Sequence, residues 1–106
     1  MERKCFIFRV KKERLHDYLK AHNVWTELLD TMRESGLLSY SLFYRPDGLI
    51  VGYMEGDNIM ESLRKIDGTD VSARWEAGMA QYFEGGALDK ANSTGLEWLE
   101  QYFSLL

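Results

Sequence analysis

The sequence predicts an α+β protein whose elements follow the order β-α-β-β-α-β, the ferredoxin-like arrangement around an antiparallel sheet. Two observations predict it. A long helical periodicity separates the first strand-like segment from the second, and a proline-glycine turn joins the second to the third. The chain has 106 residues, the usual size of one domain. Because no repeat or linker interrupts the chain, we expect a single domain over residues 1–106.

Three segments have the composition and alternation of β-strands. Residues 3–10, R-K-C-F-I-F-R-V, are rich in aromatic and β-branched side chains. Residues 38–45 alternate, with Tyr40, Leu42 and Tyr44 on one face. Arg45-Pro46-Asp47-Gly48 then predicts a turn, since proline presets φ and glycine accepts a positive φ. Residues 49–55 are therefore predicted to return as the second arm of a hairpin.

The segment between the first two strands is predicted to be one helix over residues 13–35. Its apolar positions recur at steps of three and four, which place them on one stripe of a helix. Gly36 follows at a position typical of a helix end. The stripe comprises Leu15, Tyr18, Leu19, His22, Trp25, Leu28, Leu29 and Met32.

The second half of the chain predicts two further helices and a closing strand. The helices cover residues 58–66 and 71–83, the latter with Asp70 as its N-cap. Residues 87–95 are polar and irregular. The aromatic and apolar segment 98–105 could be a strand or a helix end, and we favour a strand because three strands need a fourth.

One face of such a sheet carries the helices, and the other face needs cover. Aromatic residues exposed on that second face would be a liability. Two copies of the chain could cover each other, so we expect a homodimer.

Composition excludes several classes of function. A formal net charge of −4 disfavours nucleic acid as a partner, since phosphates repel an acidic surface. No apolar run is long enough to span a membrane, and no signal peptide is recognisable. The single cysteine, Cys5, cannot form a disulfide within the chain and is expected to be a buried small hydrophobe. We therefore expect a soluble, cytoplasmic protein.

No motif for a metal or cofactor is present. There is no glycine-rich phosphate loop, no cysteine or histidine cluster with metal-ligand spacing, and no nucleophile elbow. The two histidines are His16, predicted to be solvated, and His22. The sequence thus predicts no metal site and no cofactor.

The candidate functional residues gather around the first predicted helix. Tyr18 and His22 are four residues apart and share one face of a helix, with Trp25 close to it. A histidine on an apolar face is most often structural, with a hydrogen-bond partner of its own. The alternative is acid/base catalysis, which suits its ordinary pKa of ~6.5. Tyr40 and Trp75 have equally ordinary interpretations, as cross-strand and core residues.

Four segments alter this balance: residues 3–10, Y-L-K-A-H-N-V-W-T-E-L from Tyr18 to Leu28, S-Y-S-L-F at 39–43 and T-D-V-S-A-R-W at 69–75. In this order and at this spacing they resemble the L-rhamnose mutarotase family. The resemblance runs from Arg3 to about Glu84 and more loosely to the end of the chain. Its most specific part is the tyrosine-x-x-x-histidine pair followed closely by tryptophan.

The resemblance implies an isomerase that interconverts the α and β anomers of L-rhamnose without metal or cofactor. It also implies a homodimer of the dimeric α/β-barrel type. His22 matches the family's proton donor, and Tyr18, Tyr40 and Trp75 match its substrate-binding positions. Glu76 stands where members often carry a second tryptophan, so we expect it to line the substrate site as a carboxylate.

Two other departures from the family concern the backbone. Many members have proline where this chain has Thr26, directly after the tryptophan of the first helix. The asparagine- and proline-rich segment that usually follows the last helix is replaced by G-G-A-L-D-K-A-N. The loop over the site is therefore expected to differ.

Mutarotation needs one group to take the proton of the anomeric hydroxyl while another protonates the ring oxygen. We assign His22 to the ring oxygen. The partner base stays open among Glu76, a tyrosine and an ordered water, and Trp75 is the best candidate for contact with the sugar's methyl group. Two rival functions remain: a cofactor-free monooxygenase of the same architecture, and a non-catalytic small-molecule-binding dimer.

Overall fold

The computed structural model describes residues 1–106 and confirms the α+β, ferredoxin-like arrangement. The strands are β1 (Glu2–Arg9), β2 (Leu37–Tyr44), β3 (Leu49–Gly56) and β4 (Glu97–Leu99). They form one sheet in the order β2-β3-β1-β4, and every neighbouring pair is antiparallel. The three longer strands lie within one residue of their predicted bounds.

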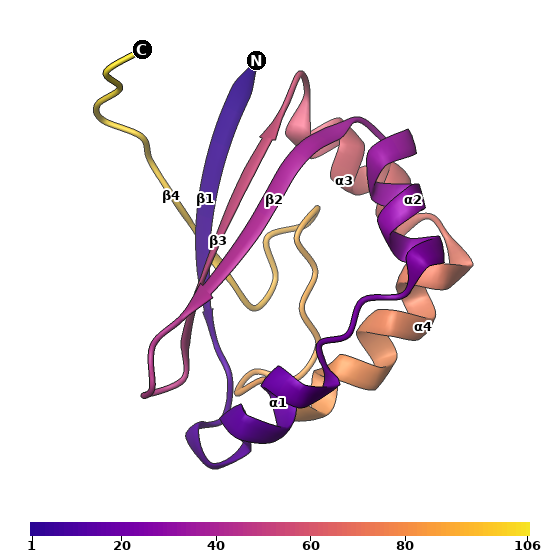
Figure 1. Ribbon diagram of the computed structural model, residues 1–106, viewed down its shortest axis with the longest axis vertical. Helices are drawn as coiled ribbons and strands as arrows, with labels where there is room; N and C mark the ends of the chain where they lie inside the picture. The colour runs from indigo at the N-terminus through magenta and orange to yellow at the C-terminus, as the bar shows by residue number, and fades with distance from the viewer.

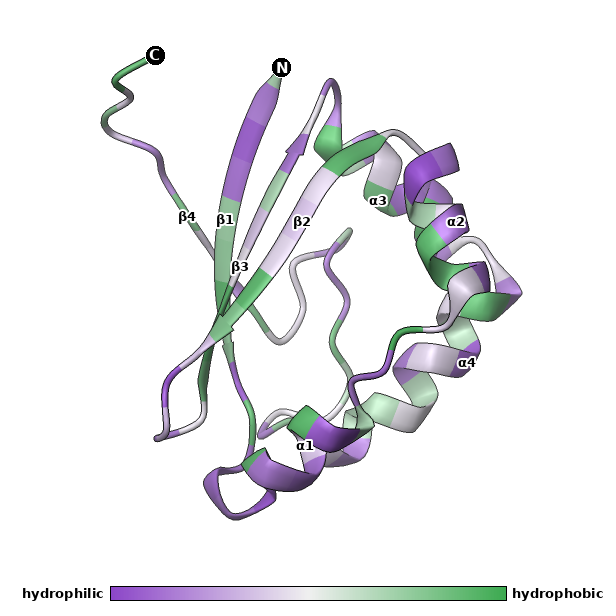
Figure 2. Ribbon diagram, viewed as in Figure 1, coloured by the Kyte–Doolittle hydropathy of each residue, from purple (hydrophilic) through white to green (hydrophobic).

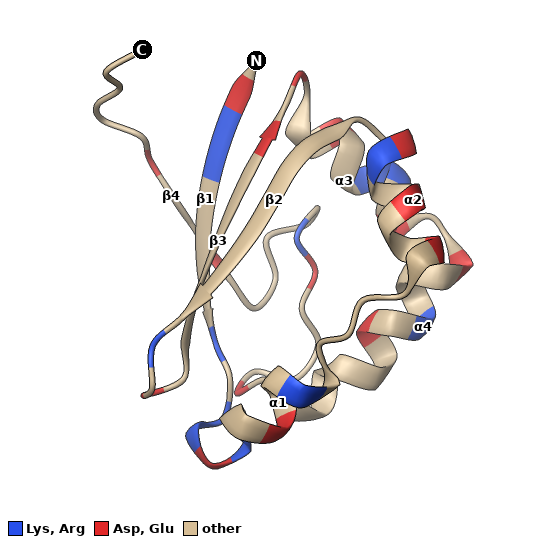
Figure 3. Ribbon diagram, viewed as in Figure 1, with Lys and Arg blue, Asp and Glu red and all other residues tan.

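The helices all lie on one side of the sheet (Figure 1). They are α1 (Leu15–Ala21), α2 (Thr26–Glu34), α3 (Ile59–Asp67) and α4 (Asp70–Met79). Short 3-10 turns over Lys12–Arg14 and Ala80–Tyr82 precede α1 and follow α4. Figure 3 shows that charged residues gather on these helices and on the turns, whereas β2 carries none.

The core lies between the helices and one face of the sheet. Alternation on β1 directs Phe6 and Phe8 into it, and Ile50 and Met54 enter from β3, all at most 6% exposed. Leu28 of α2 and Leu63 of α3 meet these residues from the helix side. These contacts hold the helices against the sheet.

The prediction of one continuous helix over residues 13–35 is wrong. The chain leaves helical geometry after α1, because His22 has ψ of 60° and Trp25 is extended with ψ of 141°. The break lets α1 and α2 direct their own apolar residues, Tyr18 and Leu28, into the core at different angles. A single straight helix could not curve around the sheet in this way.

The predicted ends of the other elements are partly confirmed. Gly36 follows α2 with a φ of +110°, and Gly48 closes the hairpin turn with a φ of +97°. Asn58 caps α3, since its side chain accepts a hydrogen bond from the N–H of Glu61. The N-cap of α4 is Thr69 rather than Asp70, because the Thr69 hydroxyl accepts from the N–H of Ser72.

The predicted closing strand over 98–105 is mostly wrong. Only Glu97–Leu99 pair with β1, opposite Ile7 to Cys5, and residues 100–106 form no secondary structure. This tail extends away from the sheet and ends in apolar residues (Figures 1 and 2). Tyr102 is 98% exposed and Leu106 is 95% exposed.

Candidate active site

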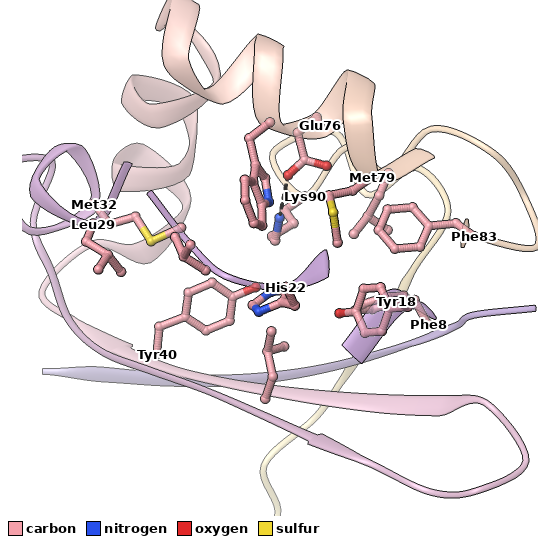
Figure 4. A pocket seen from close by; sticks show the side chains of 14 residues that line it. Phe8, Tyr18, His22, Leu29, Met32, Tyr40, Glu76, Met79, Phe83 and Lys90 are labelled. Carbon is pink, nitrogen blue, oxygen red and sulfur yellow. Dashed lines mark hydrogen bonds and ion pairs between the residues drawn. The ribbon is translucent and has the colours of Figure 1, made fainter. Parts of the chain in front are cut away.

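A cavity of about 340 Å³ lies between the helices and the core face of the sheet. This size is within the range of pockets that bind small molecules. Most of its wall is apolar, and six of its residues carry polar groups (Figure 4). Those six are Tyr18, His22, Tyr40, Trp75, Glu76 and Lys90.

His22 reaches the cavity from the break after α1. Its backbone N–H donates to the carbonyl of Tyr18 at 2.9 Å, which is the last hydrogen bond of α1. Its imidazole lies with its centre 5.6 Å from the ring of Tyr18 and 5.6 Å from the ring of Trp75. The imidazole makes no hydrogen bond with any other residue, whereas a structural histidine would be expected to have such a partner.

The environment of His22 lowers the pKa of its imidazole. Burial is the main cause, since it penalises the charged form, and the nearby charge of Lys90 adds to it. A hydrogen bond at the backbone of His22 and the charge of Glu76 oppose the shift. The proton of His22 is therefore held less firmly than that of an exposed histidine.

The two tyrosines bring hydroxyl groups from different elements. Tyr18 of α1 is 3% exposed, and Tyr40 of β2 packs beside Phe6 with ring centres 6.3 Å apart. Burial raises the pKa of both phenols, so both stay protonated near neutral pH. Neither hydroxyl has a hydrogen-bond partner in the protein, and no buried side-chain polar atom is unsatisfied, so both hydroxyls are accessible from the cavity.

Trp75 lines the cavity and packs against Trp25, which does not line it. The two indoles meet edge to face with centres 5.2 Å apart, and the guanidinium of Arg74 lies over the ring of Trp25. Trp25 is 42% exposed. His16 is exposed, as expected, and lies outside the cavity.

Glu76 enters from α4 and forms an ion pair with Lys90, a residue that the sequence analysis did not single out. Glu76 Oε1 lies 3.3 Å from Lys90 Nζ, and their side chains are 28% and 14% exposed. Burial acts to lower the pKa of Lys90, but Tyr40 and Glu76 outweigh it, so the pKa is raised and the ammonium persists. The cavity thus contains one carboxylate and one ammonium in contact.

Lys90 belongs to the irregular segment after α4, where this chain departs from the family pattern. Asp89 pairs with Thr94 through two backbone hydrogen bonds of 2.9 Å, and Asp89 also accepts from the side chain of Asn92. This turn directs Leu88 and Lys90 into the cavity. A second acidic residue, Asp67 at the end of α3, lies against it.

Asp67 provides a test of how this turn is held. Partial burial and a hydrogen bond with Asp89 raise the pKa of Asp67 to about 6. The folded protein therefore binds a proton more tightly than the unfolded chain, and ionisation of Asp67 destabilises the fold as pH rises from about 4 to about 6. We expect Asp67→Asn to raise the melting temperature by a few degrees at pH 7.5.

The same substitution should have a much smaller effect on melting at pH 3.5, where Asp67 is protonated in the folded protein and largely protonated in the unfolded chain. Paired melting curves of the two proteins at the two pH values measure this difference. A lower melting temperature for the variant at pH 7.5 would contradict the assigned environment of Asp67.

No group of three or more histidine, cysteine, aspartate or glutamate residues is placed to hold a metal ion. No helix is long and apolar enough to cross a membrane.

The fold and the cavity define a class: a small α+β protein with a ferredoxin-like fold and a mostly apolar pocket of a size that suits a small molecule. A family model described as L-rhamnose mutarotase matches residues 3–105. The chain belongs to the L-rhamnose mutarotase family and is an isomerase that interconverts sugar anomers.

Curated relatives support this assignment. The L-rhamnose mutarotase of Tolumonas auensis is 31% identical over 81 residues, covering 74% of this chain and 77% of the relative. The L-rhamnose mutarotase of Bacillus subtilis is 30% identical over 82 residues, covering 76% and 78%.

Solved structures show the same fold at lower identity. An L-rhamnose mutarotase from Formosa agariphila superposes with a TM-score of 0.79 at 19% identity, covering 100% of both chains. An antibiotic biosynthesis monooxygenase superposes with a TM-score of 0.63 at 16% identity, covering 96% of this chain and 99% of the other. These similarities concern the fold alone.

Proposed function

We propose that this chain interconverts the α and β anomers of L-rhamnose or a related deoxy-sugar, with His22 transferring the proton at the ring oxygen. The observation that carries the proposal is the convergence of His22, Tyr18 and Tyr40 on one cavity, where none of the three polar groups has a hydrogen bond to another residue. Sugar hydroxyls would supply those partners. The family relationship supplies the substrate class.

The reaction begins with opening of the pyranose. The C1–O5 bond breaks as a base takes the proton of the anomeric hydroxyl, and the bond's electron pair goes to O5. His22 gives O5 a proton, which leaves a C5 hydroxyl and an aldehyde. Rotation about C1–C2 and reclosure by the reverse transfers produce the other anomer, and His22 regains its proton.

The other side chains that line the cavity suit a deoxy-sugar. Hydroxyls of Tyr18 and Tyr40 can donate to sugar oxygens, and the edge or face of Trp75 can contact the C–H groups of the ring. Apolar residues such as Met79 and Phe83 leave room for a methyl group without a polar partner. A mostly apolar wall with a few fixed polar groups is typical of small-molecule sites.

The rival assignment of a cofactor-free monooxygenase is not favoured. Such enzymes share the fold, as the superposition at a TM-score of 0.63 shows. The sequence relatives, however, are mutarotases.

A homodimer is part of the proposal. The face of the sheet away from the helices carries Cys5, Ile7, Val51 and Tyr53 side by side in the register of β1 and β3. Phe43 and Leu99, from the strands on either side, are 61% and 43% exposed. An apolar surface of this kind favours burial against a second copy of the same face.

We expect a dimer at micromolar concentration and a monomer for Ile7→Lys, because a charge at the centre of the outer face would be desolvated in the interface. Sedimentation velocity of both proteins measures this. A wild-type chain that sediments as a stable monomer, or a variant that remains dimeric, would remove this interface.

A cytoplasmic location is also proposed. Its support is Cys5, since unpaired thiols are typical of reducing compartments. The Cys5 thiol is partly exposed on the outer face of the sheet, so the expectation that it is a buried residue is wrong.

The function is tested by NMR saturation transfer between anomer signals for L-rhamnose, L-fucose, L-lyxose and D-mannose. We expect catalytic amounts of protein to accelerate exchange most for L-rhamnose or a close relative of it. Exchange at the buffer rate for all four sugars would count against the proposal.

A further inference from the structure

The base that takes the anomeric proton is the missing half of the proposed reaction. It must be unprotonated before ring opening and must lie in the same cavity as His22. Among the cavity's titratable residues, the two tyrosines keep their protons because they are buried, and Lys90 keeps its charge. Glu76 is the one carboxylate that lines this cavity.

Glu76 and Lys90 reach the cavity from a different part of the fold than His22. Glu76 comes from α4 and Lys90 from the turn that follows it, while His22 comes from the break after α1 (Figure 4). A sugar ring between them would meet a carboxylate and an imidazole together. Ring opening needs this arrangement, because the anomeric oxygen and the ring oxygen are different atoms attached to the same carbon.

The ion pair leaves half of the carboxylate free. Glu76 Oε1 accepts the hydrogen bond from Lys90 Nζ at 3.3 Å, and Oε2 has no partner in the protein. The Glu76 side chain is 28% exposed, whereas Lys90 is 14% exposed. The free oxygen is therefore available to a ligand, while the ammonium holds the other oxygen.

We propose that Glu76 is the second catalytic residue of this mutarotase and that its carboxylate exchanges a proton with the anomeric oxygen of the sugar. The inference rests on the proposed function. During opening, the O1–H bond breaks and its proton goes to Glu76. The C1–O5 bond breaks as C1 and O1 become the aldehyde, and His22 protonates O5. During closure, O5 bonds to C1 again and returns its proton to His22, and Glu76 returns its proton to O1.

Lys90 is a positioning residue in this scheme. Its Nζ lies 3.3 Å from Oε1 of Glu76, inside a mostly apolar cavity. Lys90 therefore fixes one carboxylate oxygen and so orients the other toward a ligand.

The expected result for Glu76→Gln is a loss of anomer exchange of on the order of 10²-fold, mainly in kcat, because the amide keeps the shape but cannot accept the proton. Glu34→Gln is the matched control, since Glu34 is exposed on α2 and has no ion pair. The control should retain the wild-type rate.

The pH profile separates catalysis from support of the fold. The wild-type kcat/KM, after subtraction of the enzyme-free rate, should fall on the acid side, because a general base must be unprotonated to act. Glu76→Gln should lack this acid-side fall. Lys90→Met should lower the rate, because the carboxylate loses the contact that holds one of its oxygens. A structural role would change the amount of folded protein without moving the profile.

A Glu76→Gln protein that is folded and as active as wild type would overturn the assignment. So would a wild-type profile without an acid-side fall, which needs no variant at all. Either result would leave the proposed function intact as long as wild type accelerates exchange and His22→Asn does not. Failure of the wild-type protein on every sugar would instead remove the proposed function itself.

Discussion

Replacing His22 by asparagine should lower the rate of anomer exchange by on the order of 10²-fold or more with little change in melting temperature. Asparagine is polar and of related shape but cannot titrate. The imidazole of His22 makes no hydrogen bond with another residue, and the backbone hydrogen bond from His22 to Tyr18 is kept in the variant. The structure therefore gives little reason for a large loss of stability.

His16→Asn is the control, because His16 is an exposed residue of α1, the helix just before His22, and lies outside the cavity. Exchange rates and melting curves should be measured on the same preparations. The wild-type rate should also decline on the alkaline side, starting below pH 6.5, because the pKa of His22 is lowered from 6.5 and its acid form is lost early. An active but destabilised His22→Asn protein would show that the histidine is structural.

The second large effect is expected at Gly52, in the middle of β3. Gly52 lies opposite Phe6 of β1, and a Cβ added there would come within 2.3 Å of the Phe6 ring. Phe6 is fully buried and contacts Trp98 edge to face. Gly52→Ala should therefore force the ring out of place and cost about 1–3 kcal/mol of unfolding free energy, as overpacking of a core does.

Gly78→Ala is the matched control for the same chemical change. Gly78 lies in α4, and an added Cβ there meets nothing within 4 Å. Alanine is favoured over glycine in a helix by ~1 kcal/mol, so this variant should be more stable than wild type. Urea unfolding of both variants gives the free energies. A Gly52→Ala protein as stable as wild type would mean that the ring of Phe6 does not cover Gly52.

Local patterns in the sequence predicted much of this fold. Alternation in β1 and β2, together with the Pro46-Gly48 turn, placed three strands to within one residue. Their physical origin is short-range, since the period of two and the positive φ of Gly48 depend on neighbouring residues alone.

The break between α1 and α2 could not be found from periodicity, because both helices direct apolar residues at compatible spacing toward one core. Thr26, the first residue of α2, gives no strong sign of a helix start. The resemblance to the family implies proline at this position in many members, and proline is favoured at the first position of a helix.

The closing strand was overextended for a different reason. Aromatic and apolar residues after Leu99 suggested pairing, but strand formation needs a neighbouring strand, and β4 pairs with β1 only at three positions. Tyr102 and Phe103 are exposed in the single chain. In the proposed dimer, the second copy could cover these side chains.

The candidate site was predicted in part. The cavity brings together Tyr18, His22, Tyr40, Trp75 and Glu76, all of which the sequence analysis named. Lys90 was missed, because it lies in an irregular polar turn and its position depends on how that turn folds onto α4. Only the three-dimensional contact with Glu76 reveals its role.

The central claim is that the protein accelerates anomer exchange without changing the position of equilibrium. The most direct measurement is saturation transfer between the α and β signals of L-rhamnose at equilibrium, as a function of protein concentration. The account predicts an exchange rate that rises in proportion to protein, with an unchanged anomer ratio. An exchange rate that stays at the buffer value as folded wild-type protein is added would contradict it.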